Sequence, residues 1–307
     1  MKVFLTGGSG MLGRHLKTEL EHLGHEVVAP NSSELDLRDA RATSELMERT
    51  APDAVVHSAA KVGGIQANIE AGGMFLTANL AIDYSVIFGA KDLGIKNFVY
   101  IGSSCMYPAN HMEPLQVSDI LSGPLEPTNA SYALAKISGT KAVEAFDAIE
   151  DFNWKTFVAS NLYGPGDHFD PARSHLLAAI ISKVQVAKEE ESTQIVMWGD
   201  GKVRREFTYV IDFAKWVGVS ISNLQNLPSI MNVGCGEDFT VQEFYNIVMS
   251  ELGFEGELIA DLSKPNGNLR KLMDSSIARS FGWNPSTTIN KGIVETHRWL
   301  LENRTNV

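Results

Sequence analysis

Short apolar runs alternate with helix-length amphipathic stretches through the first half of the chain. The runs are rich in β-branched residues, without the alternation expected of strands that face water on one side. Continuous apolar strands separated by helices are typical of a parallel sheet that is buried on both faces. The sequence therefore predicts an α/β fold of the doubly wound (Rossmann) type, with strands at KVFLTG, EVVAP, AVVHSA, NFVYIG and TFVAS and helices at 11–24, 39–50, 71–93 and 130–150.

The pattern changes after residue 161, where a Gly- and Pro-rich segment is followed by a helical pattern over 174–188 and a strand-like run before residue 199. The segment REFTYVIDFAKWVGVSI reads as a strand and a helix that return to the first domain. We therefore expect a dinucleotide-binding domain made of 1–163 and about 205–230. A smaller α/β C-terminal lobe is expected from about 164–204 and 231–307.

The charge and cysteine content limit the partners and the compartment. A net charge of −11 disfavours nucleic acid and anionic membranes, because a phosphate polymer would be repelled. Two cysteines that are 130 positions apart do not form a disulfide framework and suit a reducing compartment. We found no signal-peptide core, no run near the roughly 18 apolar residues of a membrane span, and no metal site. A cytoplasmic protein without a membrane or metal partner is expected.

Glycines recur at positions 7, 10 and 13, between the first strand and the first helix. Glycine permits the tight turn and lets the backbone approach a pyrophosphate, which the free N–H groups of the helix N-terminus attract. The GxxGxxG spacing is typical of short-chain dehydrogenases. The second strand ends without an acidic residue for a ribose 2′-hydroxyl, and Arg14 and 31–33 offer polar groups for a 2′-phosphate. We therefore expect NADP, although these residues also fit a solvated turn.

Tyr132 and Lys136 are spaced by one helical turn, about 6 Å of rise, so both side chains project from one face of the predicted helix. An adjacent ammonium lowers the pKa of a phenol, which suits proton transfer. Ser103 follows a predicted central strand, where its hydroxyl and the phenol can both bind a carbonyl oxygen. The spacing alone is common in helices, so the prediction depends on the three features together.

Several strings resemble the extended short-chain dehydrogenase/reductase family over residues 3 to about 303: the glycine turn, GSSCMYP, LEPTNASYALAK, NLYGPGD, AAKVGGIQAN, WGDGKVRREF and SKPNGNLRK. More narrowly, they resemble members that epimerise C3 and C5 of a GDP-linked 4-keto-6-deoxy sugar and reduce C4 with NADPH. The resemblance implies a homodimer that binds NADP(H) and a GDP-sugar. It places Ser103 and Tyr132 at the C4 oxygen, Lys136 on the nicotinamide ribose, and Cys105 and His175 as the acid/base pair of the epimerisations.

The resemblance also implies two sets of binding residues. The cofactor set comprises Gly7, Gly8, Ser9, Gly10, Met11, Leu12, Gly13, Arg14, Asp36, Leu37, Ala59, Ala60, Ile101, Gly102, Ser103, Ser104, Tyr132, Lys136, Ala159, Ser160, Asn161, Leu162 and His175. The substrate set comprises Asn161, Lys183, Trp198, Arg205, Asn266 and Lys271.

Two departures from the family bear on the substrate. Lys183 stands where several members have arginine, and Asn266 replaces a frequent acidic residue. Three alternatives stay open: a colitose-type synthase acting on a 3-deoxy sugar, a UDP-hexose 4-epimerase, and a dinucleotide-sensing module without catalysis. A simple 4-epimerase does not need Cys105 and His175, and a sensing module does not need the tyrosine, lysine and serine.

Overall fold

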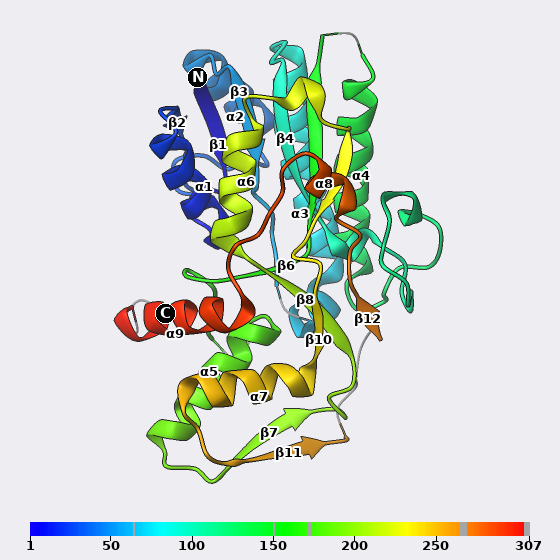
Figure 1. The fold of residues 1–307 in the computed structure, drawn as a ribbon. Coiled ribbons are helices and arrows are strands. Elements are labelled where there is room, and N and C mark those ends of the chain that lie inside the picture. The colour runs from blue at the N-terminus through cyan, green and yellow to red at the C-terminus, as the bar shows by residue number, and fades with distance from the viewer. Residues whose placement is uncertain (64, 150, 171–173, 264–268, 304–307) are drawn as a thin grey trace.

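A six-stranded parallel sheet forms the larger domain (Figure 1). The computed structural model describes the chain except residues 64, 150, 171–173, 264–268 and 304–307. The strand order is β2-β1-β3-β4-β5-β9. The bounds are β1 Lys2–Thr6, β2 Glu26–Val28, β3 Ala54–His57, β4 Asn97–Ser103, β5 Asn153–Ala159 and β9 Ile230–Val233. The predicted doubly wound α/β fold is confirmed.

Helices cover both faces of this sheet, as the apolar strands require. Successive residues of β1 point to opposite faces, so that Val3 and Leu5 belong to one core and Phe4 to the other. The first core includes residues of α1 and α6, and the second includes residues of α2, α3 and α4. These helices are α1 Met11–His22, α2 Ala40–Thr50, α3 Ile65–Asp92, α4 Ala130–Asp147 and α6 Val210–Ser220.

The smaller lobe contains a core of its own and two small sheets. In one of them β8 lies between β10 and β12 and also pairs with β6, whereas β7 and β11 form a parallel pair. Helices α5, α7 and α9 pack in this lobe (Figure 1). The bounds are β6 Asn161–Tyr163, α5 Leu176–Glu189, β7 Gln194–Trp198, β8 Arg204–Tyr209, β10 Asp238–Thr240, α7 Val241–Leu252, β11 Glu257–Asp261, β12 Arg270–Lys271 and α9 Ile289–Glu302. Helix α8 Ser276–Ser280 packs instead against β9 of the large sheet.

The chain returns to the large sheet after building part of the lobe. Helix α6 packs beside α1, and β9 then pairs in parallel with β5. We propose a domain division close to the one expected from the sequence, except that β6 and β8 belong to the smaller lobe, so that residues 1 to about 160, α6 and β9 form the dinucleotide-binding part. The six-stranded sheet is completed by β9, at the boundary of that division.

Helix α3 is unusually apolar, and non-helical backbone at Ala71 (φ −129°, ψ 28°) separates its first residues from the continuous helix that begins where the sequence predicted. Its segment Glu70–Asp92 has a mean hydropathy of 1.3, which by length and composition is enough to cross a membrane. The expectation that no segment reaches this level is therefore wrong for α3. Helices that cover a sheet can pass the same test, and α3 packs against α2 and α4.

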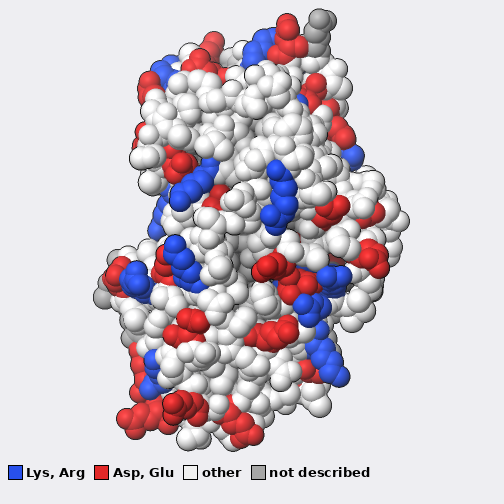
Figure 2. Space-filling model, viewed as in Figure 1, with Lys and Arg blue, Asp and Glu red and all other residues white. Residues whose placement is uncertain are grey.

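Acidic and basic side chains are interspersed on the face shown in Figure 2, with acidic groups gathered at the far end of the smaller lobe. The net charge of −11 is therefore not concentrated in one acidic surface on this face. Binding of a diphosphate by such a chain requires local donors, which makes the positions of individual lysines and arginines important.

Candidate active site

The glycine turn joins β1 to α1 with the geometry that close backbone packing requires. Gly7 has a φ of 74°, and a Cβ on Gly13 would overlap the Gly7 carbonyl. Gly10 is the N-cap of α1 and its N–H donates to the Gly7 carbonyl at 3.0 Å. Side chains at these positions would separate the helix from the strand, so the turn leaves the helix N-terminus open to an anion.

The polar residues expected near the 2′-phosphate of the cofactor differ in the contacts that their side chains make. Arg14 donates through Nε to the Ser9 carbonyl at 2.8 Å, which holds the guanidinium beside the glycine turn. Asn31 instead closes its own turn, with Oδ1 accepting from the Ser33 N–H and hydroxyl. Asp36 forms an ion pair with Arg38 at 2.7 Å. Arg14 is therefore the best placed of the expected residues to bind a phosphate.

The end of β4 brings together three of the five predicted catalytic residues. The Ser103 hydroxyl lies close enough to Tyr132 to lower the pKa of the phenol, and Cys105 lies close enough for its charge to raise it. The Cys105 N–H donates to the Ser103 hydroxyl at 3.3 Å, within the short 3₁₀ turn Ser104–Met106. A serine, a thiol and a phenol thus converge at the carboxyl edge of the sheet, where ligands of doubly wound folds bind.

Lys136 lies one turn after Tyr132 and is only 2% exposed. Its Nζ donates to the Ile101 carbonyl at 3.0 Å and lies 4.4 Å from the Tyr100 ring centroid. Burial raises the pKa of Tyr132 far above its usual value, and the charges of Cys105 and Asp83 raise it further. The phenol is therefore not acidified as the sequence argument expected, and it is suited to donating a proton.

Asn129 is a site residue that the sequence argument did not single out. Its Nδ2 lies 3.6 Å from the Cys105 sulfur, and its Oδ1 is buried without a hydrogen-bond partner among the described residues. Buried amide oxygens are normally paired, so this atom is available to a hydroxyl of a bound molecule. The residue is the N-cap of α4, three positions before Tyr132, and this proximity was the available signal.

His175 stands apart from this cluster. It is the N-cap of α5, its side chain keeps contact with solvent, and no hydrogen bond to Cys105 or Tyr132 is found among the described residues. Its crowded surroundings and then the charge of His168 lower its pKa, which favours the neutral imidazole at pH 7. The structure thus does not join His175 to the predicted acid/base partner.

The predicted substrate residues come from the smaller lobe. Lys183 on α5 lies 5.3 Å from the Trp198 ring centroid, and Trp198 at the end of β7 is 62% exposed. Arg205 and Lys271 are paired in register on β8 and β12, which places two cations on neighbouring strands. Asn161 begins β6 and donates to the Glu206 carbonyl at 2.8 Å. Asn266 lies outside the described residues.

Comparison with known proteins identifies the family. Residues 3–234 match the model of the NAD dependent epimerase/dehydratase family. The chain belongs to this family. It is similar to the GDP-L-fucose synthase of Azorhizobium caulinodans, at 44% identity over 98% of this chain and 96% of that protein. It is also similar to the GDP-L-colitose synthase of Yersinia pseudotuberculosis, at 37% identity over all of both chains.

A solved structure is also similar to this member of the NAD dependent epimerase/dehydratase family. The GDP-mannoheptose C4 reductase from Campylobacter jejuni, with NADP bound, has a TM-score of 0.88 and 28% identity. The match covers 98% of each chain. The similarity therefore includes the smaller lobe as well as the large sheet.

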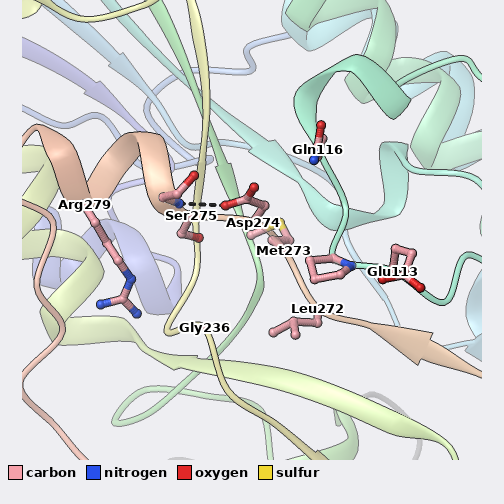
Figure 3. A pocket seen from close by; sticks show the side chains of 10 residues that line it. Glu113, Gln116, Gly236, Leu272, Met273, Asp274, Ser275 and Arg279 are labelled. Atoms are coloured by element: carbon pink, nitrogen blue, oxygen red, sulfur yellow. Dashed lines mark hydrogen bonds between the residues drawn. The ribbon is translucent and has the colours of Figure 1, made fainter.

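A pocket of about 590 Å³ is separate from the catalytic cluster of this epimerase/dehydratase family member. It lies between the loop around Glu113 and the segment from Leu272 to Arg279 (Figure 3). The Ser276 N–H donates to Asp274 at 2.9 Å, and Arg279 donates to the Cys235 carbonyl. Its charged residues, Glu113, Asp274 and Arg279, are of mixed sign, and none of the predicted catalytic residues lines it.

Proposed function

We propose that this protein is an NADPH-dependent enzyme that epimerises C3 and C5 of GDP-4-keto-6-deoxy-D-mannose and reduces C4, yielding GDP-L-fucose. The observation that supports the proposal most is the convergence of Ser103, Cys105 and Tyr132 at the end of β4. GDP-L-fucose synthases among its relatives, including the protein of Azorhizobium caulinodans, match over nearly the whole chain.

The chemistry of a 4-keto sugar explains why one cluster can serve three steps. Protons on C3 and C5 both flank the ketone, so removal of either gives an enolate with its charge on the C4 oxygen. Ser103 and Tyr132 are proposed to donate hydrogen bonds to this oxygen. Cys105 is proposed as one member of the acid/base pair, because its sulfur lies at the cluster, and His175 is proposed as the other.

Bound NADPH supplies the hydride that reduces C4. The glycine turn, Arg14 and the strand ends of β3, β4 and β5 are proposed to hold it, with Lys136 donating to the nicotinamide ribose. Tyr132 then gives its proton to the C4 oxygen. The raised pKa of this phenol keeps the proton in place until the alkoxide forms.

The diphosphate of the substrate is proposed to bind between Lys183, Arg205 and Lys271, with Trp198 and Asn161 beside it. Arg205 is partly buried, and burial lowers its pKa while the charge of Glu126 raises it. Asn266 belongs to the same proposed set. Cations on β8, β12 and α5 supply the local positive charge that an acidic chain otherwise lacks.

The experiment that tests the proposal combines purified protein, NADPH and GDP-4-keto-6-deoxymannose in deuterated water. We expect NADPH oxidation, deuterium at C3 and C5, and GDP-L-fucose as the product by NMR. NADPH oxidation without deuterium at these carbons would indicate a simple 4-reductase instead. A second candidate, C5 epimerisation and C4 reduction of the 3-deoxy analogue to GDP-L-colitose, is supported by the full-length similarity to the Yersinia protein. Competition between the two ketones decides between them.

We also propose that the protein is a cytoplasmic homodimer without a membrane or nucleic-acid partner. Leu80, Tyr84 and Phe88 recur every fourth residue on α3, and each is at least 38% exposed. Residues four apart lie on one helix face, and an exposed apolar stripe of this kind is typical of a protein interface. A second copy of the chain would bury this stripe.

Replacing Tyr84 with arginine tests the dimer. The variant should be monomeric in size-exclusion chromatography with light scattering, because a charge in the interface centre loses its hydration. Val219→Arg on α6 is the matched control, since Val219 is 54% exposed on a helix of the opposite layer. Equal masses for wild type and Tyr84→Arg would contradict this interface.

A further inference from the structure

A buried polar network lies directly beneath Lys136 and is not used by the proposed chemistry. Asp83 on α3 is its centre, at 5% exposure. One carboxylate oxygen lies 3.0 Å from His57 Nε2, and the other accepts from the Tyr100 hydroxyl at 2.7 Å. His57 and Tyr100 are fully buried on β3 and β4. Buried groups of this kind are costly unless fully paired, so the network needs a reason.

Burial and the contacts of His57 together indicate the charge on the network. Burial lowers the pKa of His57, which favours the neutral imidazole. Its Nε2 faces the Asp83 carboxylate, which can only accept, so the ring proton lies on Nε2. Nδ1 then accepts from the Thr6 hydroxyl at 2.7 Å. Asp83 therefore receives two donors and remains the anion of the network.

The anion and the catalytic lysine contact different parts of Tyr100. Lys136 Nζ lies over the face of the Tyr100 ring, while the hydroxyl of the same ring donates to Asp83. A phenol that donates to a carboxylate becomes more electron-rich, which strengthens its attraction for a cation. The order of the groups is thus carboxylate, phenol and ammonium, with opposite charges at the two ends.

Helix packing maintains this arrangement. A Cβ on Gly139 of α4 would lie 2.8 Å from Asp83 Oδ2 and would also overlap the Tyr100 hydroxyl. Glycine at this position lets α4 approach the network closely, so that Lys136 reaches the ring.

We propose that Asp83, acting through Tyr100, is the buried counter-ion and positioning residue that keeps Lys136 protonated and aimed at the cofactor. The inference rests on the proposed function only in assigning Lys136 to the nicotinamide ribose. The titratable groups that face the lysine and its network are His57 from β3, Asp83 from α3, Tyr100 from β4 and Tyr132 from α4, with Cys105 beyond Tyr132.

The direction of the pH effect follows from the charges. Burial lowers the pKa of Lys136, and the charge of Asp83 raises it. The same charge raises the pKa of Tyr132. Removing the charge of Asp83 lowers the pKa of Lys136 and the pKa of Tyr132 directly. The protonated lysine and phenol that reduction needs are therefore lost at a lower pH. A charge within a few ångströms shifts a pKa by about 1 to 3 units, and each unit changes the protonated fraction about tenfold above the pKa.

The test compares Asp83→Asn, Tyr100→Phe and Asp147→Asn with wild type over a pH series. Asp147 is the matched control, because it is also a buried carboxylate and pairs with Lys155 at 2.7 Å away from the site. The readouts are the NADPH dissociation constant by fluorescence titration and kcat for reduction. In the pH profiles of both readouts, we expect the loss of activity or binding at high pH to begin about one pH unit or more lower in Asp83→Asn. The change should be smaller in Tyr100→Phe and absent in Asp147→Asn.

The outcomes separate the possible failures. Unchanged alkaline limbs in folded Asp83→Asn, or in Tyr100→Phe if the first variant does not fold, would overturn the role of Asp83. An equal shift in Asp147→Asn would show a general stability effect and would overturn it as well. If wild type binds NADPH but does not reduce the GDP-ketosugar, the proposed function fails, and the NADPH titrations still decide on Asp83.

Discussion

Tyr132→Phe should lower the rate of C4 reduction by about 10²- to 10⁴-fold, the usual contribution of a positioned general acid. The reason is that the alkoxide at C4 loses its proton donor, while Ser103 keeps one hydrogen bond to the oxygen. Deuterium exchange at C3 and C5 should fall less, because the enolate needs a hydrogen bond at C4 but not the proton itself. Stopped-flow NADPH oxidation and NMR exchange measure the two separately.

A matched control for this variant is Tyr163→Phe, which removes a phenol hydroxyl that is buried in the core of the smaller lobe. It should retain both activities after correction for folded protein. If Tyr132→Phe reduces the ketone as fast as wild type does, Tyr132 is not the proton donor. Ser103 would then be the alternative donor.

Cys105→Ser should lower the rate of deuterium exchange at C3 and C5 by about 10²- to 10⁴-fold. Reduction of the unepimerised ketone should continue. A serine hydroxyl is a far weaker acid than a thiol, so it does not form the required anion near neutral pH. The product in NADPH should therefore change from GDP-L-fucose to the C4-reduced sugar with its original C3 and C5 configuration. NMR in deuterated water identifies both products.

Cys235→Ser is the control for the second cysteine. Burial, and then the charge of Glu206, raise the pKa of Cys235 to about 12, so it is not a base at neutral pH. This variant should exchange and reduce as wild type does. Normal exchange in Cys105→Ser would show that the base is another group.

Local patterns accounted for the parts of the structure that are set by short-range geometry. The predicted helix containing Tyr132 and Lys136 is confirmed as α4. Residues four apart lie on one face of any helix, so their spacing alone was enough to place them together. The glycine turn was likewise predictable, since the steric need at Gly7 and Gly13 is local. The parallel sheet followed from the alternation of apolar runs, and the non-helical backbone at Ala71 marks where the helix expected from residue 71 begins within α3.

Long-range contacts explain what the sequence argument missed. Asp83 meets His57 and Tyr100 only after three separate elements have packed, so no spacing in the chain reveals the network. The contact of Asn129 with the Cys105 sulfur likewise depends on how the loop before α4 closes over β4. The pKa of Tyr132 was expected to fall because an ammonium is near, but burial has the larger effect and raises it.

The placement of β9 at the edge of the large sheet has a consequence for dissecting the molecule. A fragment that stops after β5 would leave that strand with one row of backbone amides and carbonyls unpaired, a template for association with other chains. The dinucleotide-binding part therefore cannot be isolated as an N-terminal fragment. Most of the polypeptide must be synthesised before the six-stranded sheet can be completed by β9.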